Sequence, residues 1–350
     1  MLSLPESALL WVARLDEALR GDPLLPAWRQ RAMVREAARA AASDGLMVDM
    51  VRLGGLLAGL PLRHLADFGA ERHALEVLVG LRNLAANTPN DRVRAALSRM
   101  KAEHKPGRNL LEAAARGMLA HLADGGARED ARLALPLYLL DTGVVRSGPL
   151  PCLTGSGAFR AEGSPRDLAA GFHEALCRDL AGEARNGLDD LIDLRRAWRS
   201  WRRRLGPRRS TSQLPALVDY AAACQAVTPA QVAQHFDLSL RGAGKLLAEL
   251  AELGILVDAS GRETWKVYVT EDLKSVREEV ERVQPARAGD PTPSPKPGKP
   301  PPPRPAALEA DPLELADDLS GLLADTERAL ARIQRRLDAP PLPFRLEPED

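Results

Sequence analysis

Aromatic residues and cysteines are scarce in this sequence, and each scarcity narrows the class of protein. Phe, Trp and Tyr make up only 4% of the 350 residues, whereas Ala, Leu and Arg dominate. These three residue types are strong helix formers, so the composition favours a mainly α-helical protein with at most a small sheet. Cys152, Cys177 and Cys224 are widely spaced and odd in number. They suggest no disulfide framework and fit a reducing cytoplasm.

Long apolar runs are also missing. No run approaches the ~18 consecutive apolar residues of a membrane span. The N-terminal stretch "MLSLPESALLWVARLDEALR" contains acidic residues and lacks the basic start and long apolar stretch of a signal peptide. We therefore expect a soluble, cytoplasmic protein with no membrane partner, located on the nucleoid when it binds DNA.

The chain has no net charge, with 48 basic and 48 acidic residues, but the charges are unevenly distributed. From Arg195 to Lys274 there are 13 Lys and Arg against 8 Asp and Glu, whereas residues 275–350 contain 11 against 15. A neutral body, a basic module and an acidic tail therefore follow one another along the chain.

The periodicity of the apolar residues, and the Gly and Pro residues that end helices, divide the chain into five parts. Residues 1–206 are expected to form a helical domain of unknown function that ends in an Arg-rich helix, after which Gly206-Pro207 breaks the helix. The other parts are a module at 207–283, a Pro-rich linker at 284–310, an amphipathic helix at 311–338 and a tail at 339–350. Within the first domain we expect helices at 27–43, from about 49, and at 69–87, 91–103, 109–123, 129–140, 166–184 and 188–205.

The expected helix at 311–338 carries an apolar stripe that a lone helix cannot bury. The Pro-rich linker before it cannot form a core and is expected to be semi-extended. The stripe therefore needs a partner, which is a second copy of the chain, another protein or the body of the same chain.

The stretch "TPAQVAQHFDLSLRGAGKLLAELAELG" contains two helical patterns separated by Asp237, Leu238 and Ser239. Thr228 and Gln231 form a capping box with Pro229 at the first helical position, and Ser239 is placed to cap the helix at 240–253. A helix at 213–224 precedes this pair, and alternating strands near 255–257 and 265–269 follow it. The order predicts a winged helix-turn-helix. In its second helix the inward face is expected to consist of Leu240, Ala243, Leu246, Leu247, Leu250 and Leu253.

This motif presents the N-terminal part of its second helix to the major groove of DNA. We therefore expect double-stranded DNA as the partner, with contacts from Arg208, Arg209, Ser239, Arg241, Gly242, Lys245, Arg262 and Lys266. Arginine can pair bidentately with guanine, and lysine acts more as a point charge. Gly242 and Gly244 cost helix stability, either to admit the DNA backbone or to allow close packing between helices.

The segment at 195–209 contains eight arginines in fifteen positions. These arginines either contact phosphates or form a solvated helix face. Those at 202–204 are expected where phosphates, not base edges, are within reach. Trp198 and Trp201 are at helical spacing and are expected in the core.

The segments "LIDLRRAWRSWRRRLGPRRSTSQLPALVDYAAA" and "VTPAQVAQHFDLSLRGAGKLLAELAELGIL" resemble a bacterial family of uncharacterised helix-turn-helix proteins. "AARAAASDGLMVDMVRLGGLLAGL" and "LPCLTGSGAFR" are similar to it as well, so the resemblance covers roughly 25–273. Its most specific parts are Leu-Arg-Arg-Ala-Trp at 194–198 and Arg-Arg-Ser at 208–210. Members join a helical domain of unknown function to a DNA-binding module, and the resemblance implies DNA binding but no reaction.

Catalytic and cofactor motifs are not found in the sequence. "LTGSGAF" lacks the Gly-Lys-Ser/Thr ending of a phosphate-binding loop. His173 and Cys177 are four residues apart on one helix, and two ligands without a third are a weak metal signal. We expect no enzyme, no metal and no cofactor.

The leading hypothesis is a transcriptional regulator that binds DNA. The alternative is a non-enzymatic scaffold, or an accessory protein of chromosome or plasmid maintenance, whose winged helix docks on protein. A third hypothesis, an enzyme hidden in the helical domain, has no catalytic motif to support it.

Overall fold

The computed structural model describes residues 2–49, 53–54, 57, 69–86, 88–160, 165–224, 226–260 and 266–271. All of these belong to one compact unit, Met1–Arg287. The described chain is mainly helical, as the composition predicts. The Pro-rich linker, the helix expected at 311–338 and Arg262 lie outside the described residues. None of the described helices is long and apolar enough to cross a membrane.

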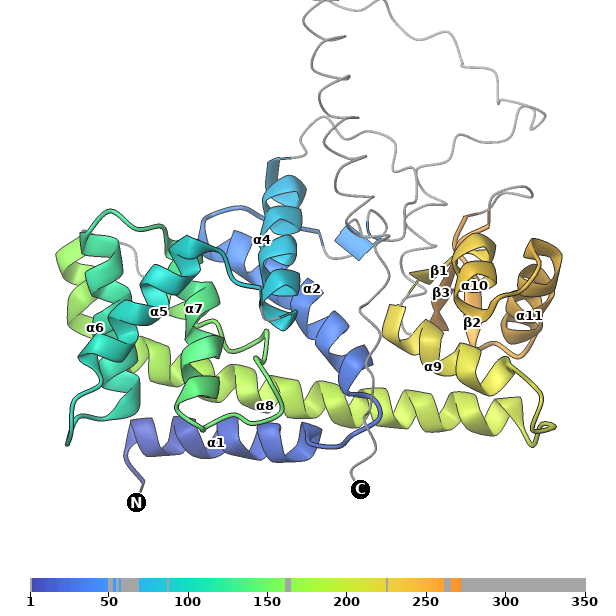
Figure 1. Cartoon of the computed structure of the whole chain (residues 1–350), viewed down its shortest axis with the longest axis horizontal. Coiled ribbons are helices and arrows are strands. Elements are labelled where there is room, and N and C mark those ends of the chain that lie inside the picture. Colours follow the sequence, from blue (N-terminus) through green and yellow to red (C-terminus); the bar gives the residue numbers. More distant parts are fainter. Residues whose placement is uncertain are drawn as a thin grey trace, which may run out of the picture. The chain divides into compact units, whose positions relative to one another are not determined.

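The first part of the chain is a helical body (Figure 1). Its elements are α1 (Leu4–Leu19), α2 (Leu25–Ser43), α4 (Gly69–Ala85), α5 (Asp91–Glu103), α6 (Leu110–Ala123), α7 (Arg128–Asp141), the 3₁₀ helix η1 (Ser156–Arg160) and α8 (Pro165–Leu205). Local signals explain most boundaries. The side chain of Asn90 accepts the amide of Val93, and that of Asn109 accepts the amide of Leu111, so each caps the helix that follows. Gly45, with a φ of 83°, follows α2 in the left-handed conformation that favours glycine.

The long helix α8 differs from the expectation of two helices at 166–184 and 188–205. It is continuous over 41 residues. The reason is tertiary: Trp28 of α2 packs against α8 at Gly187, where a Cβ would lie only 3.1 Å from the indole ring. The indole N–H of Trp28 also donates to the carbonyl of Gly187 at 2.8 Å. Gly187 therefore admits a neighbouring helix instead of ending its own.

Helix α1 was not among the expected elements. Ser3 and Glu6 form a capping box at its start. It packs along α8 (Figure 1), with Ala8, Val12, Leu15 and Leu19 fully buried. Its carboxylate Asp16 is 1% exposed, and Oδ1 accepts hydrogen bonds from the amides of Arg146 and Ser147 at 3.0 and 2.8 Å. Asp16 thereby fixes the loop after α7 to α1.

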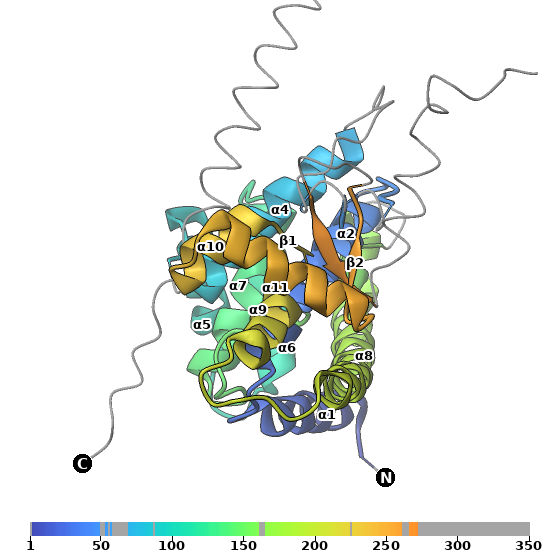
Figure 2. The same cartoon turned by 90° about the vertical axis from the view of Figure 1, so that its right-hand side faces the viewer.

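A second group of elements follows α8 (Figure 2). This C-terminal module consists of α9 (Leu214–Cys224), β1 (Ala226–Val227), α10 (Pro229–Phe236), α11 (Leu240–Glu252), β2 (Leu256–Asp258) and β3 (Tyr268–Thr270). The strands form an antiparallel sheet of order β1-β3-β2, with Val269 opposite both Ala226 and Val257. The two strands expected after α11 are present, whereas β1 was not expected.

The carboxylate of Asp16 provides a test of how the body is held together. Burial raises the pKa of Asp16, but its hydrogen bonds from Ser147, Arg146 and Arg20 outweigh burial and hold that pKa below its usual value. Asp16→Asn should therefore lower the free energy of unfolding at pH 7 by about 1–3 kcal/mol. A carboxylate with a lowered pKa contributes stability above its unfolded pKa and loses it as the pH falls through the folded value. The deficit of the variant should thus shrink below about pH 4.

Glu17→Gln, at a position whose side chain is 71% exposed, is the matched control and should change stability by less than about 0.5 kcal/mol. Urea titrations at several pH values measure both variants. A deficit for Asp16→Asn that stays constant down to pH 3 would contradict the assigned role of the charge.

Candidate nucleic-acid interface

The connection between α10 and α11 has the geometry that the sequence predicts. The amide of Gln231 bonds to Thr228 Oγ1 at 3.3 Å, and the amide of Thr228 bonds to Gln231 Oε1 at 2.9 Å, which completes the capping box. Asp237 takes the left-handed conformation with a φ of 51°. Ser239 Oγ then accepts the amide of Gly242 at 3.1 Å and starts α11. Helix α10 therefore stops and α11 restarts within three residues.

Most of the expected inward face of α11 is confirmed. Ala243, Leu247 and Leu250 are fully buried, and Leu246 and Leu253 are partly buried. Leu240 is a correction, because it is 63% exposed. It lies on the same side of the helix as Leu247, but the core does not cover it.

The outward face of the first two turns of α11 carries two cations. Arg241 and Lys245 are both exposed. Within the described residues neither side chain makes a hydrogen bond or an ion pair. Because they are four residues apart, the two side chains lie on one face of the helix. This pair is a positive site that nothing in the described chain neutralises.

The glycines of α11 are not explained by close packing between helices. A Cβ added at Gly244 would meet no atom of the described chain within 4 Å, and one at Gly242 would meet only Ser239 Oγ, at 3.2 Å. Both residues have ordinary helical backbone, since neither is among the glycines with positive φ. Close packing against another helix of the described chain is therefore not the reason for these glycines.

The other basic residues expected at the interface differ in whether a carboxylate of the module pairs with them. Arg209 is exposed, whereas Arg208 pairs with Glu249 at 2.9 Å and bonds to the carbonyl of Leu205. Lys266, beside β3, lies 3.5 Å from Asp258. Arg208 and Lys266 are therefore partly neutralised by carboxylates of their own module.

Two of the arginines in the last turns of α8 bind groups of the C-terminal module. Arg202 donates to Asp219 of α9 at 2.5 Å, and Trp198 donates to the other oxygen of the same carboxylate at 2.7 Å. Arg204 donates to the carbonyl of Gly254 at 2.6 Å and also pairs with Glu271. Arg202 and Arg204 thus have partners within the module, and phosphate contact by the arginines at 202–204 stays a prediction.

Arg199 and Arg203 point outward on α8. Both are exposed and make no hydrogen bond or ion pair within the described residues. Trp201 is buried, as expected, but Trp198 is only partly buried, and its indole N–H donates to Asp219. Asp219, Gly254 and Glu271 are the partners that the sequence pattern did not reveal, because they lie far from the arginine run in the sequence.

A further contact links the helical body to the module. Arg31 of α2 donates to the carbonyl of Ala222 in the last turn of α9 at 2.5 Å. Carbonyls at the end of a helix lack partners within the helix, and a positive side chain satisfies them and complements the helix dipole. Hydrogen bonds from side chains of α8 and α2 thus hold the module, in addition to the covalent connection between α8 and α9.

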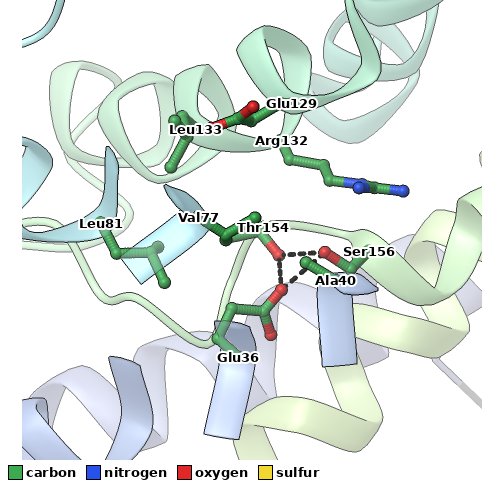
Figure 3. A pocket seen from close by; sticks show the side chains of 9 residues that line it. All are labelled: Glu36, Ala40, Val77, Leu81, Glu129, Arg132, Leu133, Thr154 and Ser156. Atoms are coloured by element: carbon green, nitrogen blue, oxygen red, sulfur yellow. Dashed lines mark hydrogen bonds between the residues drawn. The ribbon is translucent and has the colours of Figure 1, made fainter. Parts of the chain in front are cut away.

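The Gly-rich loop before η1 has a structural role inside the body. Thr154 and Ser156 donate to one carboxylate oxygen of Glu36 (Figure 3). Arg39 donates to the other oxygen at 2.8 Å. Glu36 is 1% exposed. Burial raises the pKa of Glu36, opposed by the charge of Arg39 and by the two hydroxyls.

The cavity beside this carboxylate is too small for a ligand. It encloses about 10 Å³, whereas pockets for small molecules usually hold about 300–1,000 Å³. There is room for about one water molecule. The loop is therefore a packed connection, and its hydroxyls donate hydrogen bonds to the buried carboxylate of Glu36.

The pair His173 and Cys177 is brought together, with Nε2 and Sγ 3.5 Å apart. Burial raises the pKa of the Cys177 thiol to about 11, so the residue is a neutral thiol near pH 7. No group of three or more His, Cys, Asp or Glu side chains suited to a metal occurs among the described residues.

No protein-family model matches the sequence, and a search of curated proteins finds no match. Inference about function therefore depends on the geometry of these residues.

Gly244 provides a test of the open surface on α11. Gly244→Ala should raise the free energy of unfolding by up to about 1 kcal/mol, because alanine is the better helix former and its Cβ meets no atom. Gly242→Ala is the control, and its gain should be smaller because the new Cβ crowds the capping hydroxyl of Ser239. Urea denaturation measures both. A loss of stability in Gly244→Ala would show that the site is packed rather than open.

Proposed function

We propose that this protein binds double-stranded DNA through a winged helix-turn-helix and acts as a transcriptional regulator. The observation that carries the proposal is the pair Arg241 and Lys245, exposed and unpaired on the first two turns of α11. In a helix-turn-helix, these turns are the ones that meet the base edges in the major groove.

The order of elements supports the winged helix. The module runs helix, strand, helix, helix, strand, strand, and the strand that follows the first helix pairs with the last strand. This arrangement holds the hairpin of β2 and β3 beside α11, where a wing contacts the sugar-phosphate backbone. The resemblance to a family of helix-turn-helix proteins points to the same function.

Charge and shape on α11 fit DNA as well. No acidic residue lies in the first turn of α11, and its two glutamates, Glu249 and Glu252, lie near its end. Bare backbone at Gly244 leaves space for a base edge or a phosphate group to approach closely. The excess of basic residues from Arg195 to Lys274 supplies attraction to phosphates that does not depend on base sequence.

A protein-docking module is the second candidate, and the exposed Leu240 is the observation that favours it. A gel shift at increasing salt distinguishes the two functions, because DNA binding through phosphates weakens steeply with salt.

Arg241 is expected to read a base. After selection of preferred duplexes from a random library, Arg241→Ala should lose about 1–3 kcal/mol of binding to the selected duplex and relax the preference at one base pair. Arg196→Ala is the control, since Arg196 is also exposed but lies on α8 beside Asp193. Fluorescence anisotropy with selected and unrelated duplexes measures the difference. An equal loss on both duplexes would assign Arg241 to phosphate contact instead.

The two sets of arginines on α8 should differ in their salt dependence. Changing Arg199 and Arg203 to Gln should flatten the plot of log K against log salt by about 0.9 for each phosphate that is no longer neutralised. Changing Arg202 and Arg204 to Gln should leave that slope nearly unchanged but lower the stability of the protein, because both hold the module. A slope unaffected by the first pair would show that this face of α8 points away from DNA.

A further inference from the structure

Leu240 is the first residue of α11 and is exposed where its position on the helix predicts burial. The capping of the helix is done by Ser239, so Leu240 is not needed to start α11. Neighbours three and four residues later would normally shelter such a side chain. Here they are Ala243, which is buried, and Gly244, which has no side chain. The leucine therefore contributes little to folding and is open to contact from outside.

The surroundings of this leucine are cationic. Arg241 follows it directly and Lys245 lies one turn further on, both exposed and without partners in the described chain. A protein partner for this surface would have to bury the leucine while also supplying acidic groups for both cations. The major groove supplies negative charge along its edges and an apolar group within it, the C5-methyl of thymine.

We propose that Leu240 is a specificity-determining residue that contacts the C5-methyl group of a thymine next to the base pair read by Arg241. This inference rests on the proposed DNA-binding function and adds to it the base that the helix prefers. Thymine is the only one of the four bases that presents a methyl group in the major groove, so an apolar side chain gains most from a thymine. Burying one methyl group corresponds to about a fourfold gain in affinity.

The test uses the full chain and two kinds of duplex. The wild type and Leu240→Ala are each used to select sequences from a random library. The wild type should enrich a site that contains a thymine next to a guanine, and the variant should keep the guanine and lose the thymine. In the selected site the thymine is then replaced by uracil, which removes only the methyl group. That change should weaken binding of the wild type about fourfold and leave binding of Leu240→Ala unchanged.

Ile192→Ala is the matched control, because Ile192 is an equally isolated apolar side chain, 50% exposed, on α8. It should select the same site as the wild type. Both substitutions are at exposed positions, so both variants should fold, which circular dichroism checks.

The outcomes separate this inference from the proposed function. A wild type that enriches no sequence overturns DNA binding, and the role of Leu240 with it. A wild type that selects a site but binds thymine and uracil equally overturns the role of Leu240 alone. Unchanged selection by Leu240→Ala, together with a lower mass in light scattering, would assign Leu240 to a contact between copies of the chain and also overturn the inference.

Discussion

The contact between Trp28 and the backbone of α8 at Gly187 is the constraint on which the arrangement of the chain depends. Without a side chain at 187, the indole ring and Leu15 of α1 come into contact with α8, and the indole N–H bonds to the helix carbonyl. The helix continues past this contact and reaches 41 residues in all, a length of about 60 Å. The first part of this one helix thus packs in the helical body, and its last turns hold the C-terminal module.

The end of α8 shows how residues of one type can have different roles in neighbouring positions. Arg202 and Arg204 find a carboxylate and a main-chain carbonyl of the module. Arg199 and Arg203, which are four residues apart and share one face of the helix, find no partner in the described chain. A guanidinium group suits both roles, because its fixed fork of donors matches carboxylates and phosphates equally well. The geometry of the helix, not the residue type, assigns each arginine to one role.

Burial of charge follows the same logic inside the body. Glu36 is enclosed, and its hydrogen bonds come from three groups that the fold brings to it. They are the hydroxyl of Thr154 just before η1, the hydroxyl of Ser156 at the first position of η1, and the guanidinium of Arg39. Arg39 in turn bonds to Asp179 of α8 at 2.7 Å. An isolated buried carboxylate would be costly, whereas this network satisfies it and ties α2, the loop and α8 together. The serine and threonine of the Gly-rich loop are thereby accounted for without a ligand.

Features whose partners lie within about four residues could be predicted from the sequence alone. The caps at Asn90, Asn109 and Thr228 and the short turn before Ser239 are of this kind, and all are present, because the donor and acceptor are close along the chain. The mainly helical class and the outward placement of Arg241 and Lys245 follow in the same way from propensity and periodicity.

The tertiary structure decided the features whose partners are distant in sequence. The continuity of α8 depends on Trp28, the anchoring of Arg204 depends on Gly254 and Glu271, and strand β1 exists only because β3 returns beside it. The exposure of Leu240 belongs to the same group. Its helical position predicts burial, and only the extent of the surrounding core determines whether anything covers it.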